Sequence, residues 1–105
     1  MIKVTVMYPY RENARFDFDY YLTRHMPMMQ AILGAACLRW EVDRGIWVDG
    51  GNAAPPYVAV AHLYCTSLEA FQAATAPHAA EIRADVANYT DLQPVRQISE
   101  VMEKV

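Results

Sequence analysis

The chain has 105 residues, of which 54% are hydrophobic and 20% charged, a balance typical of one globular domain rather than of a disordered segment. Its formal net charge is −3 and it has no run of lysine and arginine, which argues against nucleic acid or an anionic membrane surface as a partner. No apolar stretch approaches the roughly 20 residues that span a bilayer, and the first residues lack the pattern of a signal peptide, so we expect a cytoplasmic protein.

The N-terminal part of the chain predicts a strand followed by a bent helix. Apolar residues alternate over 2–8, which is typical of a strand, and this one carries little charge on either face. A helix is expected over 17–33, because Asp17 suits an N-cap and apolar residues then recur at helical spacing. Pro27 lacks an N–H and crowds the preceding turn, so we expect the helix to bend beside His25.

The segment 36–48 alternates again and predicts a second strand. In that strand we expect Leu38, Trp40 and Val42 to share one face, with Cys37 on the other. The two cysteines of the chain form no Cys-x-x-Cys pair, and reducing compartments disfavour disulfides. We therefore expect both cysteines to be buried, reduced thiols.

The second half of the chain predicts the same succession of elements. A third strand is expected over 57–65, and a helix after it is broken by Pro77 and runs to about residue 87. The segment 92–102 predicts the fourth strand, with a proline near its start, where proline is tolerated.

This βαββαβ order, without a linker, predicts a single α+β domain over 1–105. The expected fold is a ferredoxin-like sandwich, an antiparallel sheet in the order 4-1-3-2 with two helices on one face. The first and third strands are apolar on both faces, so the uncovered face would exceed the patch of roughly 400 Å² that a monomer tolerates. We therefore expect a homodimer through the open sheet face.

Three strings of residues lead to a family: Tyr8-Pro9, Phe16-x-x-x-Tyr20-Tyr21-x-x-x-His25-x-Pro27, and Asn88-Tyr-Thr-Asp91 followed by Pro94. Over nearly the whole chain, the sequence resembles the EthD family, which is named for its association with bacterial degradation of ethyl tert-butyl ether. The resemblance implies a dimeric α+β barrel, in which two ferredoxin-like protomers pack sheet against sheet. Similar domains are linked to dehydration, cyclisation or decarboxylation of aromatic polyketides, and the wider superfamily includes isomerases, cofactor-free monooxygenases and haem-binding enzymes.

His25 and Tyr21 are the candidate catalytic residues. His25 titrates near neutral pH, so a ring that faced a pocket between helix and sheet would serve as a general acid/base. The alternative is a structural role, in which the ring donates to a carbonyl left free by Pro27. Tyr21 lies four residues earlier on the same helix face and would orient the ring or bind a substrate oxygen. Its alternative is a core tyrosine with a satisfied hydroxyl.

The expected ligand is a small hydrophobic or aromatic compound, because the chain offers an adaptable apolar lining. The candidate binding residues are Tyr8, Met29, Trp40, His62, Tyr64 and Phe71. His62 is a polar handle if its strand face lines the barrel, and a core histidine if that face meets the helices. A haem would need His78 as its ligand, and otherwise His78 is an exposed surface residue. No metal-ligand spacing and no glycine-rich phosphate loop is present, so we expect no metal and no cofactor.

Together these features predict a small-molecule-binding protein of a catabolic or secondary-metabolite pathway. The leading hypothesis is a cofactor-independent lyase or isomerase that catalyses dehydration, isomerisation or decarboxylation, with His25 as acid/base and Tyr21 as its partner. Two alternatives remain open: a binding or accessory protein without chemistry of its own, and a haem-binding or cofactor-free monooxygenase of the same superfamily.

Overall fold

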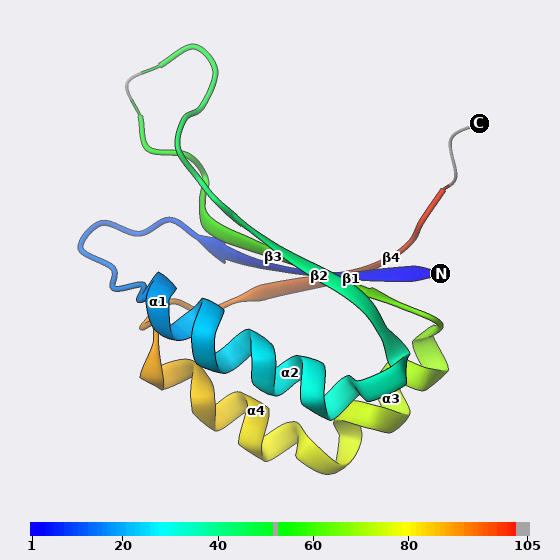
Figure 1. The fold of residues 1–105 in the computed structure, drawn as a ribbon. Helices are drawn as coiled ribbons and strands as arrows, with labels where there is room; N and C mark the ends of the chain where they lie inside the picture. The colour runs from blue at the N-terminus through cyan, green and yellow to red at the C-terminus, as the bar shows by residue number, and fades with distance from the viewer. Residues whose placement is uncertain (52, 103–105) are drawn as a thin grey trace.

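The computed structural model describes residues 1–51 and 53–102, and its strands form one antiparallel sheet in the order β2-β3-β1-β4. The strands are β1 (Ile2–Pro9), β2 (Cys37–Arg44), β3 (Tyr57–Cys65) and β4 (Val95–Glu100). This order is the predicted 4-1-3-2 order seen from the other edge. The helical segments lie together on one face of the sheet, which confirms the α+β ferredoxin-like sandwich (Figure 1).

The first helical segment contains a π-helical turn. It comprises α1 (Phe18–Tyr20), the π-helix η1 (Tyr21–His25), α2 (Met26–Leu33) and the 3-10 turn η2 (Gly34–Ala36). Asp17 is the N-cap, as predicted, and accepts a hydrogen bond from the backbone N–H of Tyr20. The N–H of Met26 bonds the carbonyl of Tyr21, five residues back, so the expected irregularity at His25 is a π turn immediately before Pro27.

The second helical segment is broken at Pro77, as the sequence predicts. It comprises α3 (Leu68–Thr75), the 3-10 turn η3 (Ala76–His78), α4 (Ala79–Asp85) and a closing 3-10 turn η4 (Val86–Asn88). Ser67 caps α3 by accepting a hydrogen bond from the N–H of Ala70. Every helix within residues 1–51 and 53–102 is too short or too polar to cross a bilayer.

The second strand departs from the prediction at its start. The register passes from Cys37 opposite Cys65 to Arg39 opposite Tyr64, so Leu38 is the extra residue of a β-bulge and is 55% exposed. The prediction that Leu38 shares a face with Trp40 and Val42 is therefore wrong, because the bulge turns Cys37 to that face instead. Both cysteines are free thiols; Cys65 is buried and Cys37 is half-buried.

Two strands are also shorter than predicted. β2 ends at Arg44, and β4 covers only Val95–Glu100. Beyond β2 the chain leaves the sheet as an arm, residues 45–56, of which the structure describes all but 52. The arm rises on the side away from the helices (Figure 1). Its base is tight, since a Cβ at Gly45 would collide with the carbonyl oxygen of Tyr57.

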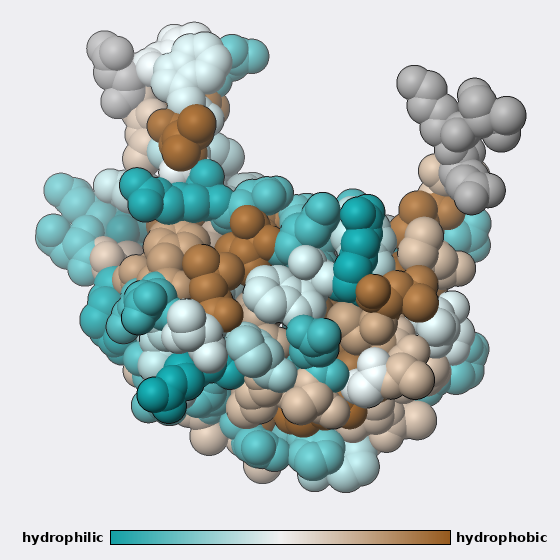
Figure 2. All heavy atoms as spheres, viewed as in Figure 1, coloured by the Kyte–Doolittle hydropathy of each residue, from teal (hydrophilic) through white to brown (hydrophobic). Residues whose placement is uncertain are grey.

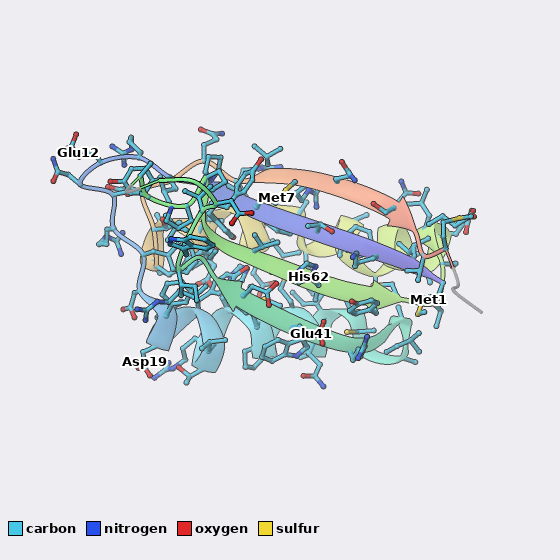
Figure 3. The ribbon with its side chains drawn as sticks, turned by 90° about the horizontal axis from the view of Figure 1, so that it is seen from above. Met1, Met7, Glu12, Asp19, Glu41 and His62 are labelled. Atoms are coloured by element: carbon cyan, nitrogen blue, oxygen red, sulfur yellow. The ribbon has the colours of Figure 1, made fainter. Side chains whose placement is uncertain are left out.

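The core lies between the sheet and the helices. Alternate residues of β1 and β3 point into it and are buried, among them Val4, Tyr8, Ala61 and Leu63. No described helix covers the opposite, open face of the sheet, on which Figure 3 shows Met7, Glu41 and His62. The sheet thus has one face that builds a core and a cavity, and one face without cover.

Candidate functional site

A cavity of about 360 Å³ lies between the sheet and the helices. This size falls in the range of small-molecule pockets. Its wall is mostly apolar and draws on β1, β3, β4 and both helical segments, with Met26, Met29, Leu63 and Phe71 among its residues. The His25 ring also lines it.

His25 is paired with Asp85 across the two helical segments. The Nδ1 atom of His25 lies 2.8 Å from Oδ2 of Asp85, and the two side chains are only 7% and 14% exposed. A carboxylate can only accept, so Nδ1 carries the proton and donates it. Within the described residues, the hydrogen bond to Asp85 is the one that the His25 ring forms, and it leaves Nε2 without a partner. The neutral ring therefore keeps an unshared electron pair on Nε2, beside the cavity.

Asp85 is held as a carboxylate by neighbouring donors. The Tyr20 hydroxyl donates to Oδ1 over 2.7 Å, and the Asn88 amide donates to the same oxygen over 3.0 Å. Burial alone would raise the pKa of the Asp85 carboxyl, but hydrogen bonds from Tyr20, His25 and Asn88 outweigh burial and hold that pKa below its ordinary value. The acceptor for Nδ1 is thus ionised at neutral pH.

Burial has opposite effects on the two pKa values, because it raises the pKa of a carboxyl and lowers the pKa of an imidazole. Removal from water lowers the pKa of the imidazole below 6.5, and the hydrogen bond to Asp85 offsets only part of this effect. At neutral pH the ring is therefore uncharged. A neutral imidazole that carries its proton on the nitrogen facing a carboxylate is arranged as a general base.

Three tyrosines complete the wall around the ring. The ring of Tyr21 stacks on His25 with an interplanar angle of 11°, and the ring of Tyr89 lies 4.7 Å from it, centroid to centroid. The hydroxyls of Tyr8 and Tyr89 lie 2.6 Å apart. Burial is the largest cause that raises the pKa of each of these three phenols. They stay protonated at neutral pH, and the contact between Tyr8 and Tyr89 uses the proton of one of those two hydroxyls.

Five of the eight predicted site residues meet at this cavity: His25, Tyr21, Tyr8, Met29 and Phe71. Trp40 does not line it; its indole N–H donates to the side-chain oxygen of Gln30 over 2.8 Å. His78 lies outside as well, since its side chain is 43% exposed and pairs with Glu81.

The remaining two predicted residues, His62 and Tyr64, lie on the open face of the sheet. Nε2 of His62 lies 2.9 Å from Oδ2 of Asp43, and the Tyr64 hydroxyl donates to Glu41 over 3.3 Å. The alternative that His62 faces the helices is thereby excluded. Its Nδ1 atom is buried and has no partner among the residues that the structure describes.

Sequence reasoning gave no role to Asp85, Tyr89, Tyr20 or Asn88. Asp85 lies 60 residues from His25, at the end of a helix whose local sequence marks no site. Tyr20, Asn88 and Tyr89 do fall within the strings that carry the family resemblance, and that was the available signal. In the described part of the chain, no three His, Cys, Asp or Glu side chains gather as a metal site would require.

The EthD domain model matches residues 12–93. An EthD-like protein from Ralstonia eutropha JMP134 is 53% identical to the chain, with a TM-score of 0.92 over 98% of this chain and 94% of that one. No curated protein matches.

Two more distant structures share the fold. SnoaB from Streptomyces nogalater, a cofactor-independent oxygenase, is 15% identical, with a TM-score of 0.58 over 99% of this chain and 94% of that one. A dimeric ferredoxin-like protein from an uncultured marine organism is 11% identical, with a TM-score of 0.55 over 99% of this chain and 96% of that one.

Proposed function

We propose that this chain, which belongs to the EthD family, binds a small hydrophobic or aromatic compound in its cavity and moves protons on it without a cofactor. One observation carries the proposal. His25 donates from Nδ1 to an ionised carboxylate, while Nε2 beside an apolar cavity has no partner among the described residues. The structural alternative, in which the ring donates to a backbone carbonyl left free by Pro27, is not favoured, because Nδ1 donates to Asp85 instead.

The chemistry follows from the lone pair on Nε2. Nε2 takes a proton from a carbon next to a carbonyl, and the C–H electron pair becomes an enolate. The imidazolium that forms is stabilised by the adjacent Asp85 carboxylate. The ring then gives the proton to a leaving hydroxyl, which departs as water, or to another carbon, which completes an isomerisation.

The tyrosines have two roles in this proposal. Tyr21 orients the imidazole by stacking on it, so that Nε2 keeps its direction during proton transfer. Tyr8 and Tyr89 line the same cavity as neutral phenols; one hydroxyl of the pair donates to the other, and the second can donate to a substrate oxygen as negative charge develops there.

Proton exchange on a probe ketone tests the proposal without the natural substrate. The probe is 2-tetralone, an aromatic ketone with acidic C–H groups, and its deuterium uptake from D₂O is followed by NMR. We expect the protein to accelerate uptake, and His25→Asn to abolish the acceleration while the fold is retained. His78→Asn is the matched control, since His78 lies outside the cavity. Binding of 2-tetralone without accelerated exchange would favour the non-catalytic binding protein.

Oxygenation is the second candidate, because SnoaB, which shares the fold, is a cofactor-independent oxygenase. The same Nε2 base would then deprotonate a phenolic substrate, whose carbanion reacts with O₂. Oxygen consumption with a phenolic probe such as a naphthol, absent in His25→Asn, would favour oxygenation over lyase or isomerase chemistry.

The proposed assembly is a homodimer through the open sheet face. That face carries apolar Met7, Val58 and Val60, and the exposed Ile46 and Trp47 belong to the arm. Figure 2 shows hydrophobic atoms on this arm above the sheet. The dimeric relative shows that this fold pairs in another protein. Light scattering on the eluted protein measures the assembly directly.

The proposed setting is the cytoplasm, since both thiols are free. A catabolic or secondary-metabolite pathway, ether degradation included, is the role that the family name suggests.

A further inference from the structure

Two arginines lie at the cavity without partners of their own. Arg83 from α4 and Arg96 from β4 both line it, and both are exposed. Among the described residues, neither forms an ion pair or a side-chain hydrogen bond. The residues that line the cavity include no aspartate and no glutamate. The lining residues therefore include two arginines and no carboxylate, whereas the Asp85 carboxylate is bonded to His25 and the net charge of the whole chain is −3.

The fold directs both side chains toward the cavity. Arg96 is opposite Val6 in the β1–β4 register, and Val6 itself lines the cavity, so Arg96 is on the helix side of the sheet. On α4, the lining residues Ala79, Ile82 and Arg83 follow at helical spacing, which puts Arg83 on the face turned to the sheet. Figure 3 shows this yellow helical segment beneath β1 and β4.

Two carboxylates near the cavity are already engaged: Asp85 is bonded to His25, and Asp91 has partners of its own. Asp91 lies with Arg83 in a shallower surface depression next to the cavity. Its carboxylate, however, pairs with Arg11 over 3.0 Å and accepts the backbone N–H of Arg15 over 2.9 Å. The two cavity arginines therefore have no acidic partner in the described protein, and an anion is what their planar groups bind best.

We propose that the ligand of this cavity is a carboxylate: an apolar or aromatic body bearing one carboxylate group, bound at the cavity mouth by Arg83 and Arg96. The apolar body lies against Met29 and Phe71, and the reacting carbon lies deeper, next to Nε2 of His25. This inference rests on the proposed function for the place of the reacting carbon, whereas the binding of the anion is independent of it.

A pair of probes separates charge from shape. The probes are naphthalene-2-carboxylate and naphthalene-2-carboxamide, which share their apolar body, and dissociation constants are measured by calorimetry or NMR titration. We expect the carboxylate to bind roughly 10-fold or more tightly than the amide. Raising the salt concentration weakens binding of the carboxylate only, because salt screens charges at an exposed mouth.

Substitution identifies the cations. Arg83→Gln and Arg96→Gln each weaken carboxylate binding by roughly 3- to 10-fold, and the double variant binds both probes alike. Arg24→Gln is the matched control, because Arg24 is exposed, does not line the cavity and loses the same charge. Amide affinity stays constant in all variants.

Two results would overturn the inference: equal binding of both probes by the unsubstituted protein, or an equal loss of carboxylate binding in Arg24→Gln. The proposed function is judged separately, by deuterium exchange into neutral 2-tetralone. If that exchange requires His25 while the carboxylate shows no advantage, the inference on the anion fails and the proton-transfer function stands.

Discussion

Replacing Asp85 by Asn perturbs the histidine pair with minimal change of shape. The amide oxygen can still accept from Tyr20 and Asn88, and the amide NH₂ then faces Nδ1 of His25. Nδ1 becomes the acceptor, and the ring proton moves to Nε2, where the lone pair was. To present a lone pair at Nε2 again, the ring would have to place its Nδ1–H against an N–H of the amide.

The cost of that arrangement sets the expected loss of rate. Two buried donors facing each other cost about 2–4 kcal/mol, which corresponds to a rate roughly 30- to 1,000-fold lower. The loss of one charge-assisted hydrogen bond also lowers the free energy of unfolding by about 2 kcal/mol. Deuterium uptake by 2-tetralone measures the first effect, and urea unfolding measures the second.

Asp19→Asn is the control, because Asp19 is exposed in α1 and contacts no part of the cavity. The ¹⁵N chemical shifts of the His25 ring provide a readout of the tautomer itself. We expect the proton on Nδ1 in the unsubstituted protein and on Nε2 in Asp85→Asn. A proton on Nε2 before substitution, or an unchanged exchange rate after it, would refute the assigned role of the pair.

The remaining predictions concern pH, the second layer of hydrogen bonds and the assembly. Because burial lowers the pKa of His25, exchange activity is expected to be constant at neutral pH and to fall only when the pH drops through that lowered pKa, below 6.5; a fall that begins above pH 7 would contradict a neutral ring. The pKa values of His25 and Asp85 are both below their ordinary values, so the unfolded chain binds more protons in acid than the folded chain does. The urea midpoint should therefore decrease from pH 7 to pH 4, and this decrease should be smaller in His25→Gln. Tyr20→Phe removes one donor to Asp85 and should raise the pKa of that carboxyl, measured by ¹³C NMR, while the ring keeps its stacking on Tyr89. Val60→Asp puts a charge on the open sheet face beside Asp43 and should convert the dimer to a monomer, as measured by light scattering. Ala73→Asp, on the exposed side of α3, is the control and should leave the dimer intact.

The fold was predictable because short-range patterns of apolar residues indicate its strands and helices. The alternation over 57–65 predicted β3 with its observed bounds, Tyr57–Cys65. The pattern failed at Leu38, because the alternation of two faces assumes that strands pair one residue to one, and a bulge breaks that count. The predicted bounds of β2 and β4 were too long, because the chain leaves the sheet as the arm after Arg44 and β4 ends opposite Ile2, the first residue of β1.

The part of the site on the first helical segment was predictable, because a local feature, Pro27, indicates it. Pro27 drew attention to His25, and helical spacing then associated Tyr21 with it. Asp85 carries no such mark, because a carboxylate at the end of a helix reads as an ordinary surface charge. Only the packing of α4 against the π turn brings its carboxylate within 2.8 Å of the imidazole, and that contact is a property of the tertiary fold.

The state of the histidine depends on two opposing effects, and neither is sufficient alone. Burial without a carboxylate would keep the ring neutral but leave its proton free to occupy either nitrogen. A carboxylate without burial would raise the pKa of the ring, so that the imidazolium would predominate and no lone pair would face the cavity at neutral pH. With both effects present, the pKa is lowered and the proton is still held on Nδ1. Tyr20 and Asn88 sustain this balance by keeping Asp85 ionised, so residues outside the cavity determine which nitrogen can act inside it.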